Sequence, residues 1–285
     1  MTSPRSMYLA IGGHEIHVTE WGEAGWPVLV MWHGLARTGR DFDVLARRYA
    51  GRYRVLCPDT IGRGRSSWSR QPDRDYSLAS YAGQAVQLLD QLGVGECQWI
   101  GTSMGGLIGI IAAAGSLRGR ITRLVLNDIG PRINPESITR IRAYVAARPS
   151  FDTMVELEAF LRQVYAPFGR LGDEEWRHLA ETSARRGDDG RWTLHYDPEV
   201  MRVFAAHPDD GHLWREWERV TCPVLVLRGE NSDVLQPEVA EEMTRRGPLA
   251  RLVTVAGCGH APALNVAAQF AVLDDFLGFT SAVPS

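Results

Sequence analysis

The stretch that most constrains this chain is residues 97–106. Within it, residues 101–105 follow the pattern G-x-S-x-G, with Ser103 at the centre. Before it lies an apolar segment short enough for a buried strand, and after it an Ala-rich apolar segment, 107–114, typical of a buried helix. A strand, a sharp turn and a helix are the context in which this motif exposes a nucleophile. We therefore expect Ser103 to project at a helix N-terminus, where free N–H groups favour developing negative charge.

Composition narrows the class of protein. The 285 residues are 45% hydrophobic, which is enough for one large α/β domain or two small ones. The net charge is −3, with both signs spread along the chain, and this argues against nucleic acid or a membrane surface as the main partner. The four cysteines are scattered without a C-x-x-C pair, and no apolar signal region or membrane span is apparent. We expect a reduced, cytoplasmic protein.

The chain contains no lysine, so all 31 of its basic residues counted as Lys or Arg are arginines. This absence excludes a Schiff-base lysine, a Ser-Lys dyad and a P-loop lysine. Enzymes that depend on pyridoxal phosphate and ordinary P-loop ATPases are thereby disfavoured. We expect no cofactor and no metal ion.

Strand and helix patterns alternate along most of the chain, which indicates a parallel sheet covered by helices. The alternation breaks between residues 131 and 219, where helical patterns rich in aromatic residues dominate and almost no strand is predicted, apart from a short extended stretch at 192–196. We predict a core domain formed by 1–130 and 220–285, with 131–219 inserted as a helical cap. The predicted core strands are 26–32, 53–59, 97–100, 121–128, 223–229 and 250–256, after a β-hairpin at 7–11 and 14–20.

Three reactive side chains follow predicted parallel strands, and the carboxyl ends of such strands form the edge where ligands bind. Ser103 needs a base, and His260 in a Gly-rich loop could accept its proton. Asp233 would then hold the imidazole in the correct tautomer. Asp128 also follows a strand and is the rival acid, but the topology favours Asp233.

The negative oxygen of a tetrahedral intermediate needs two hydrogen-bond donors. We assign them to the backbone N–H groups of Met104 and Leu35. His33, Gly34 and Thr102 are predicted at the substrate pocket, with His33 as a structural hydrogen-bonding group.

Five motifs together resemble those of the α/β-hydrolase superfamily over nearly the whole chain. They are His33-Gly34-Leu35, Asp59-x-x-Gly62-x-Gly64-x-Ser66, Gly101-Thr102-Ser103-Met104-Gly105-Gly106, Gly229-Glu230-Asn231-Ser232-Asp233 and Gly259-His260-Ala261-Pro262. The resemblance implies an α/β fold with an eight-stranded, mostly parallel sheet, helices on both faces, and a helical cap inserted after the sixth strand.

Within this resemblance, Ser103 departs from the dehalogenase and epoxide-hydrolase branches, which carry Asp at this position. The motif is similar both to carboxylesterases and to C–C hydrolases of ring-cleavage products. The latter usually carry a longer Gly-rich oxyanion loop than residues 33–37. We therefore expect a serine carboxylesterase that cleaves a small apolar ester through an acyl-enzyme on Ser103.

Several alternatives stay open at the level of sequence. Among enzymes they are a C–C bond hydrolase, a lactonase and a perhydrolase; from another class comes a ligand-binding receptor that uses the same fold. In a C–C hydrolase, Arg37 and Arg40 would be the nearest partners for a substrate carboxylate. A homodimer is also left open.

Overall fold

The computed structural model describes residues 3–202 and 212–279. Its centre is an eight-stranded sheet in the order β1-β2-β4-β3-β5-β6-β10-β11. β1 pairs with β2, and β2 with β4, in antiparallel fashion, whereas the other neighbours are parallel. The predicted eight-stranded, mostly parallel sheet is confirmed. The strands are β1 Arg5–Ile11, β2 His14–Trp21, β3 Val28–Trp32, β4 Arg54–Pro58, β5 Cys97–Thr102, β6 Ile121–Asn127, β10 Val224–Gly229 and β11 Arg251–Val255.

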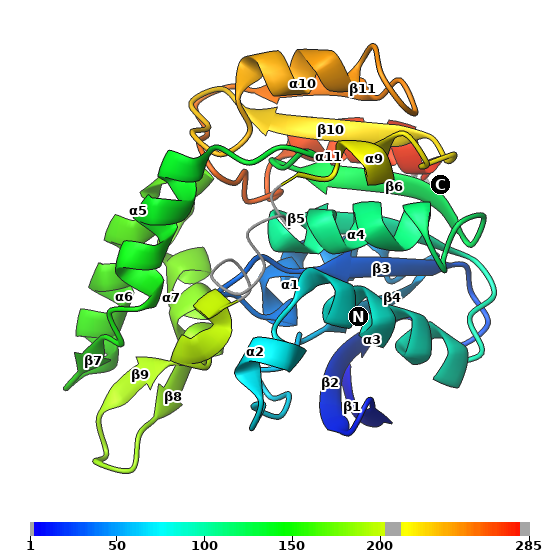
Figure 1. The fold of residues 1–285 in the computed structure, drawn as a ribbon. Helices are drawn as coiled ribbons and strands as arrows, with labels where there is room; N and C mark the ends of the chain where they lie inside the picture. The colour runs from blue at the N-terminus through cyan, green and yellow to red at the C-terminus, as the bar shows by residue number, and fades with distance from the viewer. Residues whose placement is uncertain (1–2, 203–211, 280–285) are drawn as a thin grey trace, which may run out of the picture.

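Helices cover both faces of this sheet (Figure 1). Successive strand side chains point to opposite faces, so one strand contributes to two cores. In β3, Val30 and Trp32 pack with α3 and α4, whereas Leu29 and Met31 pack with α1 and α11. The continuous apolar runs in the sequence are therefore explained by burial on both sides. The core helices are η1 Gly39–Phe42, α1 Asp43–Tyr49, α2 Pro72–Asp75, α3 Leu78–Gln91, α4 Met104–Ala114, α10 Pro237–Met243 and α11 Ala267–Leu277.

The segment between β6 and β10 adds no strand to the large sheet in its described part. In Figure 1 its main helices stand beside the ends of the strands, where the sequence analysis expects a cap. It also holds a three-stranded antiparallel sheet in the order β7-β9-β8, where the sequence predicted almost no strand. These strands are two or three residues long, too short to show an alternating pattern. The elements are α5 Pro135–Val145, β7 Ser150–Phe151, α6 Met154–Val164, η2 Ala166–Phe168, α7 Asp173–Ser183, β8 Ala184–Arg186, β9 Trp192–Leu194, η3 Pro198–Met201 and α9 Trp214–Trp217.

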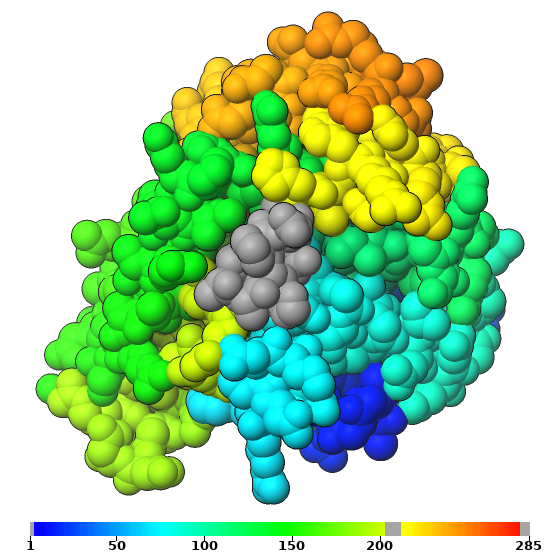
Figure 2. Space-filling model, in the orientation of Figure 1, coloured from blue at the N-terminus to red at the C-terminus, as the bar shows by residue number. Residues whose placement is uncertain are grey.

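The cap segment packs closely against the core. Tyr76, which follows α2, donates a hydrogen bond of 2.7 Å to Asp197, and Arg202 forms an ion pair with Asp73 in α2. Figure 2 shows these yellow-green and cyan parts lying against each other on the surface. The division at 131 and 219 remains an interpretation, since α9 lies inside it yet contacts α4 of the core. The predicted helix 198–206 runs into residues 203–211, which lie outside the described residues.

None of the helices in the described ranges combines the length and the apolar character needed to cross a membrane.

Candidate active site

Ser103 occupies the tight turn between β5 and α4. Its backbone has φ 51° and ψ −117°, a conformation that non-glycine residues rarely adopt. The two motif glycines make this turn sterically feasible: a Cβ at Gly101 would lie 2.3 Å from the Gly105 carbonyl oxygen, and one at Gly105 would lie 2.0 Å from that of Trp32. The strain at Ser103 is therefore held in place by close packing of β3, β5 and α4.

His260 lies in the loop after β11 and faces the nucleophile. Its Nε2 is 2.8 Å from the Ser103 Oγ, and its side chain is largely buried. The structure thus brings His260 and Ser103 together, as the sequence analysis predicts. A neutral ring with its proton on Nδ1 presents Nε2 to accept the serine proton.

The carboxylate that orients His260 belongs to Asp128, immediately after β6. The His260 Nδ1 lies 2.7 Å from Asp128 Oδ2. Asp128 is fully buried, and its two oxygens also accept hydrogen bonds from the Gly229 N–H at 2.7 Å and from the Ser232 hydroxyl at 2.5 Å. Three donors thus surround one buried carboxylate, which stabilises its negative charge.

The sequence-based choice of Asp233 as the partner of His260 is wrong in geometry. The Asp233 side chain is 44% exposed, and its oxygens contact the Arg140 guanidinium at 2.6 and 2.9 Å. The turn after β10 directs Ser232 inward and Asp233 outward. Because β6 and β10 are paired neighbours, both strand ends reach the same place, and the sequence alone could not decide which acid turns in.

The predicted oxyanion hole consists of the backbone N–H groups of Leu35 and Met104. Leu35 and Ala36 follow Gly34 at the pocket wall, and Met104 begins α4 directly after Ser103. Neither the Leu35 nor the Met104 N–H donates to another residue within the described ranges. The position of Met104 at the helix N-terminus adds the favourable end of the helix dipole.

His33 was expected at the substrate pocket, and here the structure differs. Its side chain is completely buried and is not among the residues that line the cavity, unlike Gly34 and Thr102. Nδ1–H donates to the Gly34 carbonyl at 2.6 Å, and Nε2 accepts from the Thr60 N–H at 2.9 Å. Burial lowers the pKa of His33 to about 4, so the ring is neutral. Its hydrogen bond to the Gly34 carbonyl oxygen supports the turn that carries the Leu35 N–H.

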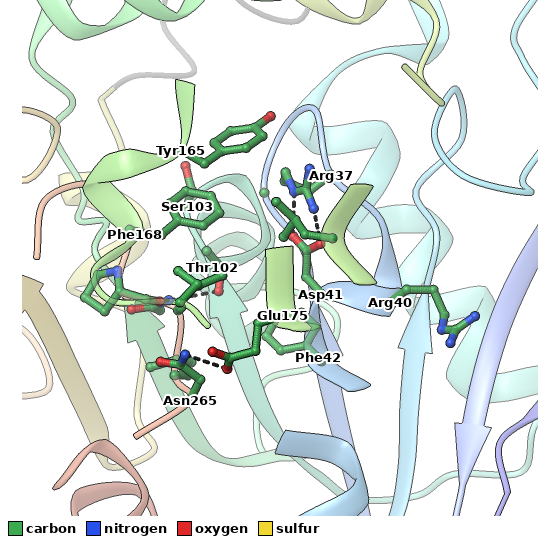
Figure 3. A pocket seen from close by; sticks show the side chains of 18 of the residues that line it. Arg37, Arg40, Asp41, Phe42, Thr102, Ser103, Tyr165, Phe168, Glu175 and Asn265 are labelled. Carbon is green, nitrogen blue, oxygen red and sulfur yellow. Dashed lines mark hydrogen bonds and ion pairs between the residues drawn. The ribbon is translucent and has the colours of Figure 1, made fainter. Parts of the chain in front are cut away.

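A cavity of about 350 Å³ extends from Ser103 and His260 between the core and the cap (Figure 3). Its cap wall is largely apolar and aromatic. The lining residues from the cap include Ile141, Tyr144, Val164, Tyr165, Phe168, Leu171 and Leu179. Pockets of this size and character accommodate small ligands and use a few polar groups for orientation.

Two arginines of the cavity wall are paired with neighbouring aspartates. Arg37 donates to both oxygens of Asp41, and Arg40 contacts Asp43 at 2.5 Å. The Arg37 pair is visible in Figure 3. Both arginines are therefore already paired, whereas binding a substrate carboxylate would require a cation that is not yet compensated. Within the described residues, no cluster of three or more His, Cys, Asp or Glu side chains could hold a metal ion.

Comparisons with known proteins identify the family of this chain. The family model described as "Alpha/beta hydrolase family" matches residues 29–273. The chain is 42% identical over 281 residues to a 3-hydroxybutyrate-oligomer hydrolase of Cupriavidus necator, a match that covers 95% of this chain and 94% of that protein. It is 26% identical over 251 residues to a 2-(acetamidomethylene)succinate hydrolase of Mesorhizobium japonicum, covering 88% and 86%.

Among solved structures, an alpha/beta hydrolase from Novosphingobium aromaticivorans superposes with a TM-score of 0.85 at 33% identity, covering 98% of this chain and all of that one. The sheet order, the strained serine turn and the family match lead to one conclusion: this chain belongs to the alpha/beta hydrolase family.

Proposed function

We propose that the protein is a serine hydrolase that cleaves carboxylic esters through an acyl-enzyme on Ser103. The observation that carries the proposal is the continuous chain from Ser103 Oγ to His260 Nε2 at 2.8 Å and from His260 Nδ1 to Asp128 Oδ2 at 2.7 Å. This arrangement activates a serine for attack on an acyl carbon.

The reaction follows from these contacts. His260 accepts the proton of Ser103 as its oxygen attacks the ester carbonyl, and Asp128 stabilises the imidazolium that forms. The N–H groups of Leu35 and Met104 stabilise the oxyanion. The imidazolium then protonates the departing alcohol, and a water molecule, activated by the same ring, hydrolyses the acyl-serine.

We further propose that the substrate is a short ester of a hydroxy acid. The relative at 42% identity is a 3-hydroxybutyrate-oligomer hydrolase, and the two chains cover each other almost completely. A cavity of about 350 Å³, with a largely apolar cap wall and with Arg37 and Arg40 held in ion pairs, suits a small substrate whose polar atoms are ester and hydroxyl oxygens.

Replacing the nucleophile tests the proposal. We expect Ser103→Ala to lower kcat on a p-nitrophenyl ester by about 10⁶-fold, the order of loss found when a triad serine is removed. A fluorophosphonate should label the wild-type chain at Ser103 alone. The control is Ser116→Ala, an exposed serine beyond the far end of α4, which should keep both activity and labelling. Labelling at another residue would refute the assignment.

Reaction class is tested separately. An ester leaves as an alcohol that needs one proton, whereas a ring-cleavage dienoate must first be ketonised and needs sites for its acid groups. Arg37 and Arg40 are already engaged by Asp41 and Asp43, which favours the ester. We expect kcat/KM for a short aryl ester to exceed that for a 2-hydroxy-6-oxo-dienoate. A preference for the dienoate would show the ester proposal to be wrong.

A further inference from the structure

Two polar side chains, Thr102 and Asn127, lie beside the nucleophile and line the same cavity as Ser103. They end the paired strands β5 and β6, where Thr102 is the register partner of Asn127. Figure 3 shows Thr102 next to Ser103 within the pocket. Neither takes part in the hydrogen bonds among Ser103, His260 and Asp128, so the proposed mechanism leaves them without a role.

The Asn127 amide donates two hydrogen bonds, and one of its partners, the Pro262 carbonyl oxygen, fixes its orientation. Its Nδ2 donates to the Thr102 Oγ1 at 3.1 Å and to the Pro262 carbonyl oxygen at 2.9 Å. The Pro262 carbonyl oxygen can only accept, so a flipped amide would place its own oxygen against it, which is unfavourable. The Oδ1 atom makes no hydrogen bond within the described ranges, although the residue is 99% buried, as its 1% exposure shows. Such an unmet acceptor is costly, and two fixed donor bonds help to offset it.

This amide determines what the Thr102 hydroxyl can do. Since its oxygen already accepts from Asn127, its own proton must point in another direction. That proton has no acceptor in the part of the chain that the structure describes, and Thr102 is only partly buried. By contrast, the hydroxyl of Thr182, another lining threonine, donates to the His178 carbonyl oxygen at 2.8 Å. Thr102 thus has a donor available to the cavity, one residue from the nucleophile.

From these contacts we propose that Thr102, oriented by Asn127, is a specificity-determining residue that donates a hydrogen bond to an oxygen on C3 of the acyl group. The inference rests on the proposed ester hydrolysis and names its substrate class, esters of 3-oxygenated acids. An oxygen on C3 is three bonds from the carbonyl carbon that Ser103 attacks. Thr102 directly precedes Ser103, and neighbouring Cα atoms are about 3.8 Å apart. The separation of the two residues is therefore of the same order as the separation of the two substrate atoms. A plain alkanoyl chain offers no acceptor there.

The test compares two substrates that differ only at C3, the p-nitrophenyl esters of 3-hydroxybutyrate and of butyrate, with both enantiomers of the former. The measured quantity is the ratio of their kcat/KM values. The ratio is used because Thr102→Val also removes the oxygen that accepts from the Asn127 amide, and this loss could lower the rates on both esters alike. We expect the wild type to prefer one 3-hydroxy enantiomer and Thr102→Val to reduce the preference about 2- to 10-fold, the effect of one neutral hydrogen bond.

Matched variants separate the hydroxyl from the shape of the side chain. Thr102→Ser keeps the hydroxyl and should retain the preference, whereas Thr102→Ala, measured in case Thr102→Val does not fold, should lose it. Thr182→Val makes the same substitution where the hydroxyl proton is already used, and should leave the ratio as in the wild type.

The outcomes distinguish this inference from the proposed function. If the wild type hydrolyses both esters and is labelled at Ser103, but Thr102→Val and Thr102→Ala leave the ratio unchanged, the role of Thr102 is refuted and the esterase proposal stands. Loss of the preference in Thr102→Ser as complete as in Thr102→Val would show that the hydroxyl does not carry the preference, and would equally refute the inference. If neither ester is hydrolysed and Ser103 is not labelled, the proposed function fails, and the inference fails with it.

Discussion

Single residues decide which carboxylate serves His260. Asp128 and Asp233 follow neighbouring strands, so both could reach the histidine. The structure buries Asp128 completely and surrounds it with donors from Gly229, Ser232 and His260. Asp233 instead pairs with Arg140 at the surface, where ion pairs contribute little to stability. Ser232, for which the sequence analysis predicted no role, lies in the turn after β10 and donates a hydrogen bond to Asp128.

We expect Asp128→Asn to lower kcat on an aryl ester by about 10⁴-fold, because an amide at this position holds the wrong tautomer of the histidine. Asp233→Asn should stay within a few-fold of the wild type. Both are compared by steady-state kinetics, with circular dichroism to confirm folding. A larger loss in Asp233→Asn would return the acid to the position that the sequence favoured.

At the scale of elements, the cap is joined to the core around the cavity by polar contacts from α7. Arg37, in the loop after β3, donates to the Ser183 hydroxyl at 2.9 Å at the end of α7. Earlier in the same helix, the His178 Nε2 lies 3.0 Å from Asp43 Oδ2 at the start of α1. The interaction with the Asp43 carboxylate raises the pKa of His178, outweighing partial burial and the nearby Arg40.

This pair predicts a pH-dependent contribution to stability. Because the pKa of His178 is raised in the folded state, its stabilisation is complete below the unfolded value near ~6.5 and disappears as the pH rises through the folded value. We expect His178→Gln to lower the urea midpoint relative to the wild type at pH 5.5, with the difference shrinking by pH 8.5.

His14→Gln is the control, since the ion-pair partner of His14 is Asp75 at the end of α2 and not a residue of α1 or α7. A deficit of His178→Gln that is equal at both pH values, or that grows toward pH 8.5, would contradict the assignment.

For the whole molecule, the central sheet is covered on both faces, so polar groups at the ends of its strands are buried. His33 is the clearest case: completely buried between the ends of β3 and β4, it exchanges hydrogen bonds with Gly34 and Thr60 only as a neutral ring. Burial also lowers the pKa of His195. The folded state therefore binds fewer protons at these two histidines than the unfolded chain does.

This difference predicts acid sensitivity of the fold. With the pKa of His33 near 4 in the folded state and ~6.5 in the unfolded chain, stability should fall as the pH drops from about 6.5 toward 4, by about 3 kcal/mol from this residue. Urea unfolding at pH 7.0, 5.5 and 4.5 measures the loss, and His33→Gln should show less of it. An equal loss in His33→Gln would assign the acid sensitivity to other groups.

Most of the architecture could be predicted from the sequence, and so could the placement of Ser103 and His260 beside each other. Local patterns carry these features: apolar runs predict buried strands, and the glycines around Ser103 allow the close approach of strand and helix that a tight turn requires. The Gly-rich loop after the last strand likewise pointed to His260. Each of these signals is carried within about ten neighbouring residues, so no knowledge of distant contacts was needed.

Three features could be read only from the tertiary structure. They are the acid that contacts His260, the complete burial of His33, and the ion pairs of the two arginines in the cavity wall. Each depends on which way a side chain turns at a strand end or on a partner far along the chain. Asp128 meets His260 132 residues away, and Arg37 meets Ser183 146 residues away. Asp128 and Asp233 end adjacent parallel strands, so strand order left both available. The choice came from packing, which turned Ser232 inward as a donor to Asp128 and left Asp233 to pair with Arg140 in solvent.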